Sequence, residues 1–262
     1  MVIELFTLCW NEAKIIPYVI DYWKHLRSQV DGFRVTVFDN CSSDDSERIL
    51  SRYDWIDVRH FESNGLNDII QRRIKDDAWK EARGRCDFVI VCDLDEVLYS
   101  VDLRGELNRM KEGGYNVLGT PLYTLCGDCV PLYRSDKLLH ESIGMAYCQR
   151  TNVSHPNLAK FMLFDPNITD EMNPSVGWHL CNPSPFRLYE SGKVFCIHID
   201  KGLDEDFFVE RRRVLRDRLS NENKRRGYSL EYSFSDEEQR KIYRENQAKA
   251  IDINEVIICN GR

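Results

Sequence analysis

The chain has 262 residues and a mass of 30.8 kDa, which is enough to bury a full hydrophobic core in one large domain. Hydrophobic residues make up 42% and charged residues 30% of the sequence, and the mean hydropathy is −0.48, which excludes disordered and collagen-like classes. The net charge of −7 and the pI near 5.5 argue against nucleic acid as the main partner, because nucleic-acid binding needs clustered Lys and Arg that neutralise phosphates.

Predicted strands and helices alternate through the first hundred residues. Apolar, β-branched and aromatic runs predict strands at residues 2–9, 33–38, 55–61 and 87–93. Apolar residues at helical spacing predict helices between these strands, at residues 12–27, from the polar turn at 39–45 through Leu50, and at 68–83. Because strands joined through helices form right-handed crossovers, we expect an α/β fold with a largely parallel sheet.

The second half of the chain is less regular. Strand-like pieces occur at residues 115–123 and 193–199, and the prolines, glycines and histidines between them indicate loops and short strands. From residue 205 onward the apolar pattern is helical, and Ser235 begins a capping box for a last helix that ends near residue 250. The sequence therefore predicts one domain followed by a helical C-terminal extension.

Neither a membrane span nor a signal peptide is expected. The sequence has no long apolar run, and the opening MVIELFTLCWNEAK has no basic region before its apolar stretch, so we expect a cytoplasmic protein. A basic cluster follows residue 210, and we favour a solvated helix face over a surface that contacts an anionic substrate or lipid. This cluster consists of Arg211, Arg212, Arg213, Arg216, Arg218, Lys224, Arg225 and Arg226.

The ten cysteines lie scattered in apolar runs and are not spaced as a disulfide framework. Most are therefore expected to be reduced and buried. Cys126 and Cys129 form a C-x-x-C pattern, but a structural zinc site needs a second pair and a redox pair sits at a helix start after a strand. We expect no chemistry at this pair.

Polar residues follow three of the predicted strands. In a parallel sheet, ligands bind beyond the carboxyl ends of the strands, which here carry Asn11 and Glu12, then Asp39 and Asn40, then the residues from Asp93 to Glu96. If the chain turns after Asp93, the carboxylates of Asp93 and Asp95 converge on a hard-oxygen site for Mg²⁺ or Mn²⁺. Such a cation suits the departure of a nucleoside diphosphate from a sugar, because it neutralises charge on the leaving group. The alternative, in which both carboxylates merely end a strand, stays open.

The sequence DLDEVL also fits a second class of enzyme. Phosphatases of the haloacid-dehalogenase type carry such a motif after a hydrophobic strand, with its first aspartate, here Asp93, as the nucleophile. In that class the motif opens its domain, whereas here about 90 residues of strand and helix precede it. No downstream set of Ser or Thr, Lys and paired Asp is evident, so this class is the weaker alternative.

Three segments, TLCWNEAKIIPYVIDYW, VFDNCSSDDS and DFVIVCDLDEVLY, resemble in this order the family 2-like glycosyltransferases of bacterial surface-polysaccharide synthesis. The segment ESNGLNDIIQRRIKDDAWKEARG and two later blocks, which contain NPSVGWH and IHIDKG, are similar to further parts of that family. The resemblance spans almost the whole chain. It implies the GT-A fold, which is Rossmann-like with a mostly parallel central sheet flanked by helices.

The resemblance also implies a domain organisation and an activity. It predicts a GT-A domain at residues 1–203, with a nucleotide-binding half at 1–100 and an acceptor-side half at 101–203, and a helical extension at 204–262. The implied reaction is metal-dependent transfer of a sugar from a UDP-sugar to a saccharide or lipid-linked glycan, with inversion favoured. A peripheral contact with the inner face of the cell membrane suits such an acceptor. A non-catalytic nucleotide-binding or glycan-binding relative is the other alternative.

Roles at the donor site follow from the resemblance, residue by residue. Asn11, Glu12 and Asp39 would line the base and ribose pocket, and Lys75 would lie near the nucleotide. Asp93 would contact ribose or metal, and Asp95 and His198 would bind Mn²⁺ or Mg²⁺. His198 also follows the apolar run KVFCI, and a neutral imidazole at a strand end is a good Mn²⁺ ligand, although a buried core histidine is the simpler alternative.

Acceptor-side roles are assigned more broadly. His179 would bind the acceptor or act as the general base, since a group that titrates near neutrality can take a proton from a sugar hydroxyl. In most inverting GT-A enzymes a carboxylate does this, so Glu171, Glu190 and Asp128 are rival bases. Lys160 and Lys201 would bind a phosphate or an acceptor carboxylate, and a solvated lysine is an equal alternative at Lys160.

Overall fold

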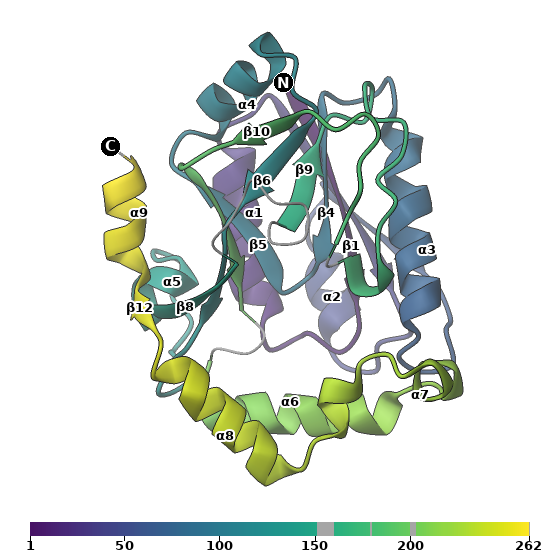
Figure 1. Ribbon diagram of the computed structural model, residues 1–262, viewed down its shortest axis with the longest axis vertical. Helices are drawn as coiled ribbons and strands as arrows, with labels where there is room; N and C mark the ends of the chain where they lie inside the picture. The colour runs from purple at the N-terminus through teal and green to yellow at the C-terminus, as the bar shows by residue number, and fades with distance from the viewer. Residues whose placement is uncertain (151–159, 179, 200–202, 262) are drawn as a thin grey trace.

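The computed structural model describes residues 1–150, 160–178, 180–199 and 203–261. Within this part of the chain, a seven-stranded sheet forms the centre of the molecule (Figure 1). In spatial order, its strands are β10 (Leu188–Glu190), β6 (Val117–Thr120), β9 (Lys160–Phe164), β4 (Phe88–Asp93), β1 (Val2–Cys9), β2 (Gly32–Asp39) and β3 (Ile56–His60). Only β9 runs antiparallel to its described neighbours, which confirms the predicted α/β fold with a mostly parallel sheet.

Helices pack against this sheet where the amphipathic patterns predict them. The first of them begins at Ile16, later than the predicted residue 12, and Pro17 occupies its first turn, a position that needs no N–H donor. The predicted helix 68–83 ends in a 3-10 turn, η1 (Trp79–Ala82). The predicted helices of the first half are α1 (Ile16–Arg27), α2 (Ser46–Leu50) and α3 (Asp68–Ala78), and a further helix that was not predicted is α4 (Leu103–Glu112).

Two hydrophobic cores lie on opposite faces of the sheet, because successive side chains of a strand point in opposite directions. In β4, Phe88 and Ile90 belong to the larger core, which also contains the buried side of α1 and α4. Val89 and Val91 belong to the smaller core with Trp79 of η1. The near-continuous apolar run of β4 is thus explained by burial on both faces, as predicted.

A second, five-stranded sheet was not predicted in this form. The expectation of one strand at 115–123 is wrong, because the chain changes sheets at Pro121, which has no N–H to donate. The predicted strand at 87–93, in the first sheet, and the predicted strand at 193–199, in the second, are confirmed. Most other strands of the second sheet are too short to show a clear periodicity. In spatial order they are β12 (Ile251–Asp252), β8 (Met145–Arg150), β7 (Leu122–Leu125), β11 (Val194–His198) and β5 (Glu96–Ser100).

The described chain after residue 203 is mostly helical, as predicted. The Ser235 side chain accepts a hydrogen bond from the backbone N–H of Glu238, so the predicted capping box is confirmed. The prediction that the helix after Ser235 is the last one is wrong, because a further strand, which pairs with β8, and a further helix, α9 (Ile253–Gly261), follow it. The domain boundaries at residues 100 and 203 stay predictions. The later helices are α5 (Leu139–Ile143), α6 (Glu205–Arg218), α7 (Asn221–Arg226), η3 (Leu230–Ser233), α8 (Asp236–Gln247) and α9 (Ile253–Gly261).

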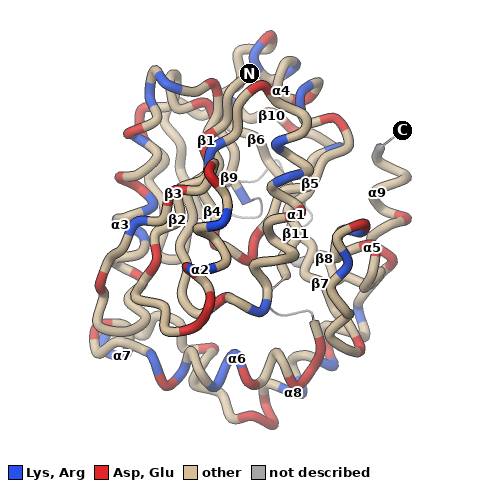
Figure 2. Tube along the Cα trace, turned by 180° about the vertical axis from the view of Figure 1, so that it is seen from behind, with Lys and Arg blue, Asp and Glu red and all other residues tan. Residues whose placement is uncertain are grey.

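Basic and acidic residues are interspersed along α6 and α8 (Figure 2). On the outer side Arg213 pairs with Asp236, which fits the favoured solvated face. Arg212, by contrast, is 5% exposed, and Arg218 points toward the sheet, so a solvated face accounts for only part of the basic cluster. No helix in the described ranges is long and apolar enough to cross a membrane, and the peripheral membrane contact stays a prediction.

The cysteines mostly lie in the cores, as predicted. Burial raises the pKa of the Cys126 thiol to about 11, whereas Cys129 is exposed, so the two thiols of the C-x-x-C pattern are not a matched pair. This geometry fits the expectation that the pair has no chemistry. The buried cysteines are Cys9, Cys86, Cys92, Cys126, Cys181 and Cys196.

A backbone seam joins α6 to the sheet end. The N–H of Leu66 donates to the carbonyl of Arg218 at 2.8 Å, and the N–H of Ser220 donates to the carbonyl of Leu66 at 3.0 Å. Gly65, with φ of +101°, lies so close that an added Cβ would be 2.4 Å from the Arg218 carbonyl oxygen. Only glycine fits this position without strain, so the seam depends on Gly65.

Gly65→Ala is therefore expected to destabilise the fold through both positive φ and a backbone clash. Gly84→Ala is the matched control, because Gly84 also has positive φ, +75°, but an added Cβ there meets no atom within 4 Å. We expect the control to cost about 1 kcal/mol and Gly65→Ala about 1–3 kcal/mol more, measured by urea unfolding. Equal losses in the two variants would mean that the seam is not tightly packed.

Candidate functional site

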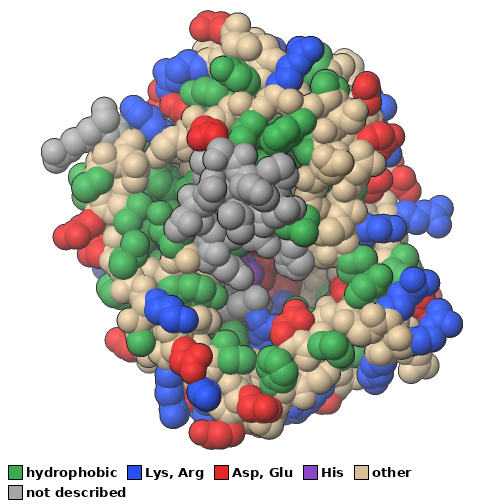
Figure 3. Space-filling model, viewed as in Figure 1, with side chains coloured by type: hydrophobic (Ala, Val, Ile, Leu, Met, Phe, Trp, Pro, Cys, Tyr) green, Lys and Arg blue, Asp and Glu red, His purple; other side chains and the backbone are tan. Residues whose placement is uncertain are grey.

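A pocket of about 360 Å³ lies at the carboxyl ends of β1, β2 and β4. Trp10 follows β1, Asn40 follows β2 and the turn at residues 93–96 follows β4, while α6 and residues 227–232 line the opposite side. In Figure 3 the molecule is hollowed on this face, and acidic, basic and histidine side chains are visible in the hollow. The structure thus brings the three strand ends singled out in the sequence to one pocket.

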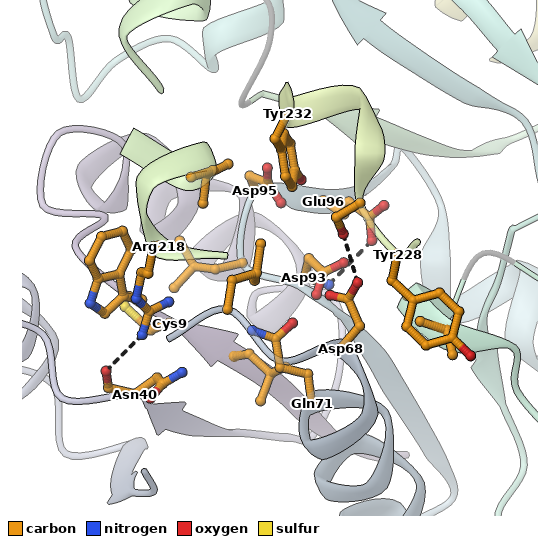
Figure 4. Close-up of a pocket in the computed structure, with 18 of the residues that line it drawn as sticks. Cys9, Asn40, Asp68, Gln71, Asp93, Asp95, Glu96, Arg218, Tyr228 and Tyr232 are labelled. Carbon is orange, nitrogen blue, oxygen red and sulfur yellow. Dashed lines mark hydrogen bonds between the residues drawn. The ribbon is translucent and has the colours of Figure 1, made fainter. Parts of the chain in front are cut away.

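The chain turns between Asp93 and Glu96, as the predicted metal site requires. β4 ends at Asp93 and β5 begins at Glu96, and Leu94 between them is buried. The side chains of Asp93 and Asp95 both line the pocket, with Asp68 nearby (Figure 4). The turn therefore gathers several carboxylates at the floor of the pocket.

Asp95 and His198 lie side by side. The Nε2 of His198 is 3.1 Å from Oδ2 of Asp95, and both side chains are largely buried at the pocket wall. The pairing of β5 with β11 fixes this contact, because it is continued by a hydrogen bond from the N–H of Ile199 to the Asp95 carbonyl at 2.8 Å. His198 lines the pocket, and its Nδ1 has no hydrogen-bond partner within the described part of the chain. Among the described residues, only one of its two ring nitrogens therefore has a polar partner.

Asp93 is paired with Lys75. The Nζ of Lys75 donates to Oδ1 of Asp93 at 2.8 Å, and the Lys75 side chain is 2% exposed, whereas that of Asp93 is 36% exposed. Lys75 lies near the end of α3 and lines the pocket, where the resemblance places it. One Asp93 oxygen is thus already engaged by an ammonium group, while the side chain still faces the pocket.

Lys160 is buried and paired with Glu96. Its Nζ donates to Oε1 of Glu96 at 2.7 Å, and both side chains are less than 5% exposed. Burial alone would lower the pKa of Lys160 and raise that of Glu96, but their mutual attraction raises the lysine pKa and lowers the glutamate pKa. The alternative of a solvated Lys160 is wrong, and its ammonium group points into the protein.

The predicted base and ribose residues take different positions. Glu12 lines the pocket, and its carboxylate accepts a hydrogen bond from Arg211 of α6. Asn11 and Asp39 are not among the described residues that line it. The Asn11 side chain accepts from the N–H of Ser43 at 2.7 Å, and buried Asp39 accepts from the N–H of Ser42 at 2.8 Å. Both shape the loop after β2.

Trp10 was missed in the sequence, and Arg218 was identified there only as a member of the basic cluster. The guanidinium carbon of Arg218 lies 3.7 Å from the centre of the Trp10 ring, and Nη2 donates to the Asn40 carbonyl at 3.3 Å (Figure 4). Burial lowers the pKa of Arg218 to about 10. Arg211, Leu215 and Arg218 recur at helical spacing and all line the pocket, so this spacing was the signal that α6 turns one side toward the sheet.

A buried polar cluster on the other side of the pocket was also missed. Asp68 Oδ2 accepts from Asn223 Nδ2 at 3.1 Å and from Ser229 Oγ at 2.6 Å, and burial raises the pKa of Asp68. The N–H of Asp68 donates in turn to Asn223 Oδ1 at 3.1 Å. These contacts hold α7 against the start of α3. No local pattern reveals them, because the partners are more than 150 residues apart.

The rival general bases lie elsewhere. Glu171 pairs with Lys80 at 2.7 Å, Asp128 accepts from Gln247 at 2.7 Å, and Glu190 is in β10 at the sheet edge. None of the three is among the described residues that line the pocket. His179 and Lys201 lie outside the described residues.

The chain matches one protein family and has a limited similarity to solved structures. No curated protein matches the chain. The structure of S. aureus TarS 1-349 is 16% identical with a TM-score of 0.48, covering 91% of this chain and 68% of that chain, and its complex with UDP-GlcNAc is 16% identical with a TM-score of 0.48, covering 94% and 71%. The model of the family described as "Glycosyl transferase family 2" matches residues 5–164. This match covers more than half of the sequence, so the chain belongs to glycosyl transferase family 2.

Proposed function

We propose that this glycosyltransferase transfers a sugar from a UDP-sugar to a saccharide or lipid-linked glycan acceptor, with a divalent cation held at Asp95 and His198. The contact between Asp95 and His198, 3.1 Å apart at the pocket wall, is the observation that carries the proposal. UDP as the nucleotide, the glycan acceptor and an inverting outcome follow from the motif resemblance.

The residues present fit a cation. A carboxylate oxygen and an imidazole nitrogen side by side form a donor set suited to Mn²⁺, and Mg²⁺ and Mn²⁺ in nucleotide enzymes are held by few protein groups plus phosphates. Asp93, which the resemblance assigns to ribose or metal, lines the same pocket, and one of its oxygens accepts a hydrogen bond from Lys75. When bound, the cation would neutralise charge on the departing diphosphate.

Different parts of the donor would contact different walls of the pocket. Trp10 offers a ring face beside the end of β1, where a nucleobase can stack once Arg218 moves aside, and Glu12 is close by for the ribose. Lys75 holds a buried positive charge next to Asp93, toward the diphosphate. His179 as acceptor-binding residue or general base, and Lys201 at the acceptor, remain part of the proposal from resemblance alone.

A thermal-shift panel of UDP and UDP-sugars, with and without Mn²⁺, tests the proposal. A ligand that binds only the native state stabilises it by about 2.7 kcal/mol at a hundred times its Kd, so the correct donor should raise Tm only when Mn²⁺ is present. Absence of stabilisation by any nucleotide would contradict it. Mn²⁺-dependent UDP binding without transfer or hydrolysis of any donor would instead support the non-catalytic relative.

A further inference from the structure

We propose that Glu96 and Lys160 are positioning residues, whose buried ion pair holds the 93–96 turn in the shape that places Asp95 against His198. The role of Asp95 and His198 in this inference rests on the proposed function. Lys160, expected from resemblance to bind a phosphate or acceptor carboxylate, would instead act from inside the protein through Glu96.

Each carboxylate of the turn has its own basic partner, and each partner comes from a different element. Asp93 pairs with Lys75 of α3, Asp95 with His198 of β11, and Glu96 with Lys160 of β9. Lysine keeps its charge at neutral pH, but a neutral histidine is itself a metal ligand. Asp95 is therefore the carboxylate of the turn whose partner can share a cation with it.

Glu96 connects the two ends of the turn. Its Oε1 accepts from Lys160 Nζ at 2.7 Å, and its Oε2 accepts from the backbone N–H of Asp93 at 3.2 Å. Glu96 is also directly opposite His198 in the antiparallel pairing of β5 with β11. Because only Leu94 and Asp95 lie between the two anchored ends, fixing those ends fixes where the Asp95 carboxylate points.

Stability alone does not explain a pair buried this deeply. Removing two charges from water offsets most of their attraction, and apolar pairs of similar volume are often at least as stable. Groups that orient metal ligands typically change metal affinity by about 10–100-fold when they are removed. The pair at Glu96 and Lys160 has the position of such an orienting group.

The double variant Glu96→Gln with Lys160→Met tests this role, because it removes both charges and keeps the side-chain volumes. Titration calorimetry in the presence of UDP gives the Mn²⁺ affinity of each variant, and circular dichroism and Tm show whether the variant is folded. The expected result is a folded protein whose Mn²⁺ affinity is about 10-fold weaker or more. A folded double variant with wild-type affinity would overturn the inference.

Glu106→Gln is the matched control. Glu106 is also a buried carboxylate, which accepts hydrogen bonds from Tyr189 and Ser191, but it is not among the described residues that line the pocket. The Mn²⁺ affinity of the Glu106→Gln variant should therefore equal that of the wild type. If the double variant does not fold, Glu96→Asp decides in the same titration, since it keeps a negative charge for Lys160 but its shorter side chain cannot hold both Lys160 and the Asp93 N–H. Wild-type protein that binds UDP without Mn²⁺ would contradict the proposed cation site. Variants that bind Mn²⁺ as tightly as the wild type would contradict only the positioning role, so the two failures are distinguishable.

Discussion

Asp95→Ala is expected to lower kcat for sugar transfer by about a thousandfold while the fold is retained. The variant loses the carboxylate that lies against His198 and is proposed to hold the cation, so a cation would no longer offset the charge that develops on the leaving diphosphate, a loss of about 4 kcal/mol in transition-state stabilisation. The measurement is donor turnover at saturating Mn²⁺, together with circular dichroism. Asp57→Ala, at an exposed site on β3, is the control with unchanged turnover. Full activity in Asp95→Ala would refute the metal assignment.

Lys160→Ala is expected to lower the free energy of unfolding by about 3–5 kcal/mol. Removing one partner leaves Glu96 charged and buried without compensation, which costs far more than the intact pair contributes. Urea unfolding measures the change, and the slope with denaturant should stay constant if the fold is unchanged.

Two comparisons make this stability test specific. The double variant Glu96→Gln with Lys160→Met should lose much less stability than Lys160→Ala, because no charge is left unpaired. Arg134→Ala breaks an exposed pair with Asp136 and should leave the midpoint of unfolding in place. A loss below about 1 kcal/mol in Lys160→Ala would mean that water reaches Glu96 readily.

Long elements with one clear period were predictable from the sequence. β1, β4 and α3 have apolar runs or stripes long enough to be recognised, and their order fixed the parallel sheet. The second sheet was missed because its strands are short. Pro121 divides a run that looks continuous in the sequence into β6 and β7.

The candidate site was predictable only where its residues follow strands. Asp95 and His198 each lie at a strand end, and the structure brings them together as expected. Asn11 and Asp39 also follow strands, but their side chains bind the neighbouring loop instead of facing the pocket. Whether a polar residue points toward or away from a pocket depends on backbone turns that periodicity does not encode. The family match contradicts the phosphatase alternative at Asp93.

The covering side of the pocket was not predicted, because the helical spacing of Arg211, Leu215 and Arg218 indicates one shared side of α6 but not which part of the chain that side contacts. Arg218 reaches Trp10 across about 200 residues, and no local pattern links them. The basic cluster was interpreted as a solvated face, since charge in a helix most often faces water. Its inward members, Arg211, Arg212 and Arg218, show that one helix can be solvated on one side and build a site on the other.

The seam between Leu66 and Leu219 has a consequence for how the pocket forms during synthesis. A ribosome releases the sheet end well before α6, so Leu66 and Trp10 emerge without the helix that later covers them. Until Leu215 and Leu219 have been synthesised, Leu66 and Trp10 lack these packing partners. The wall of the pocket that α6 supplies can therefore be completed only late in synthesis, once this helix has emerged.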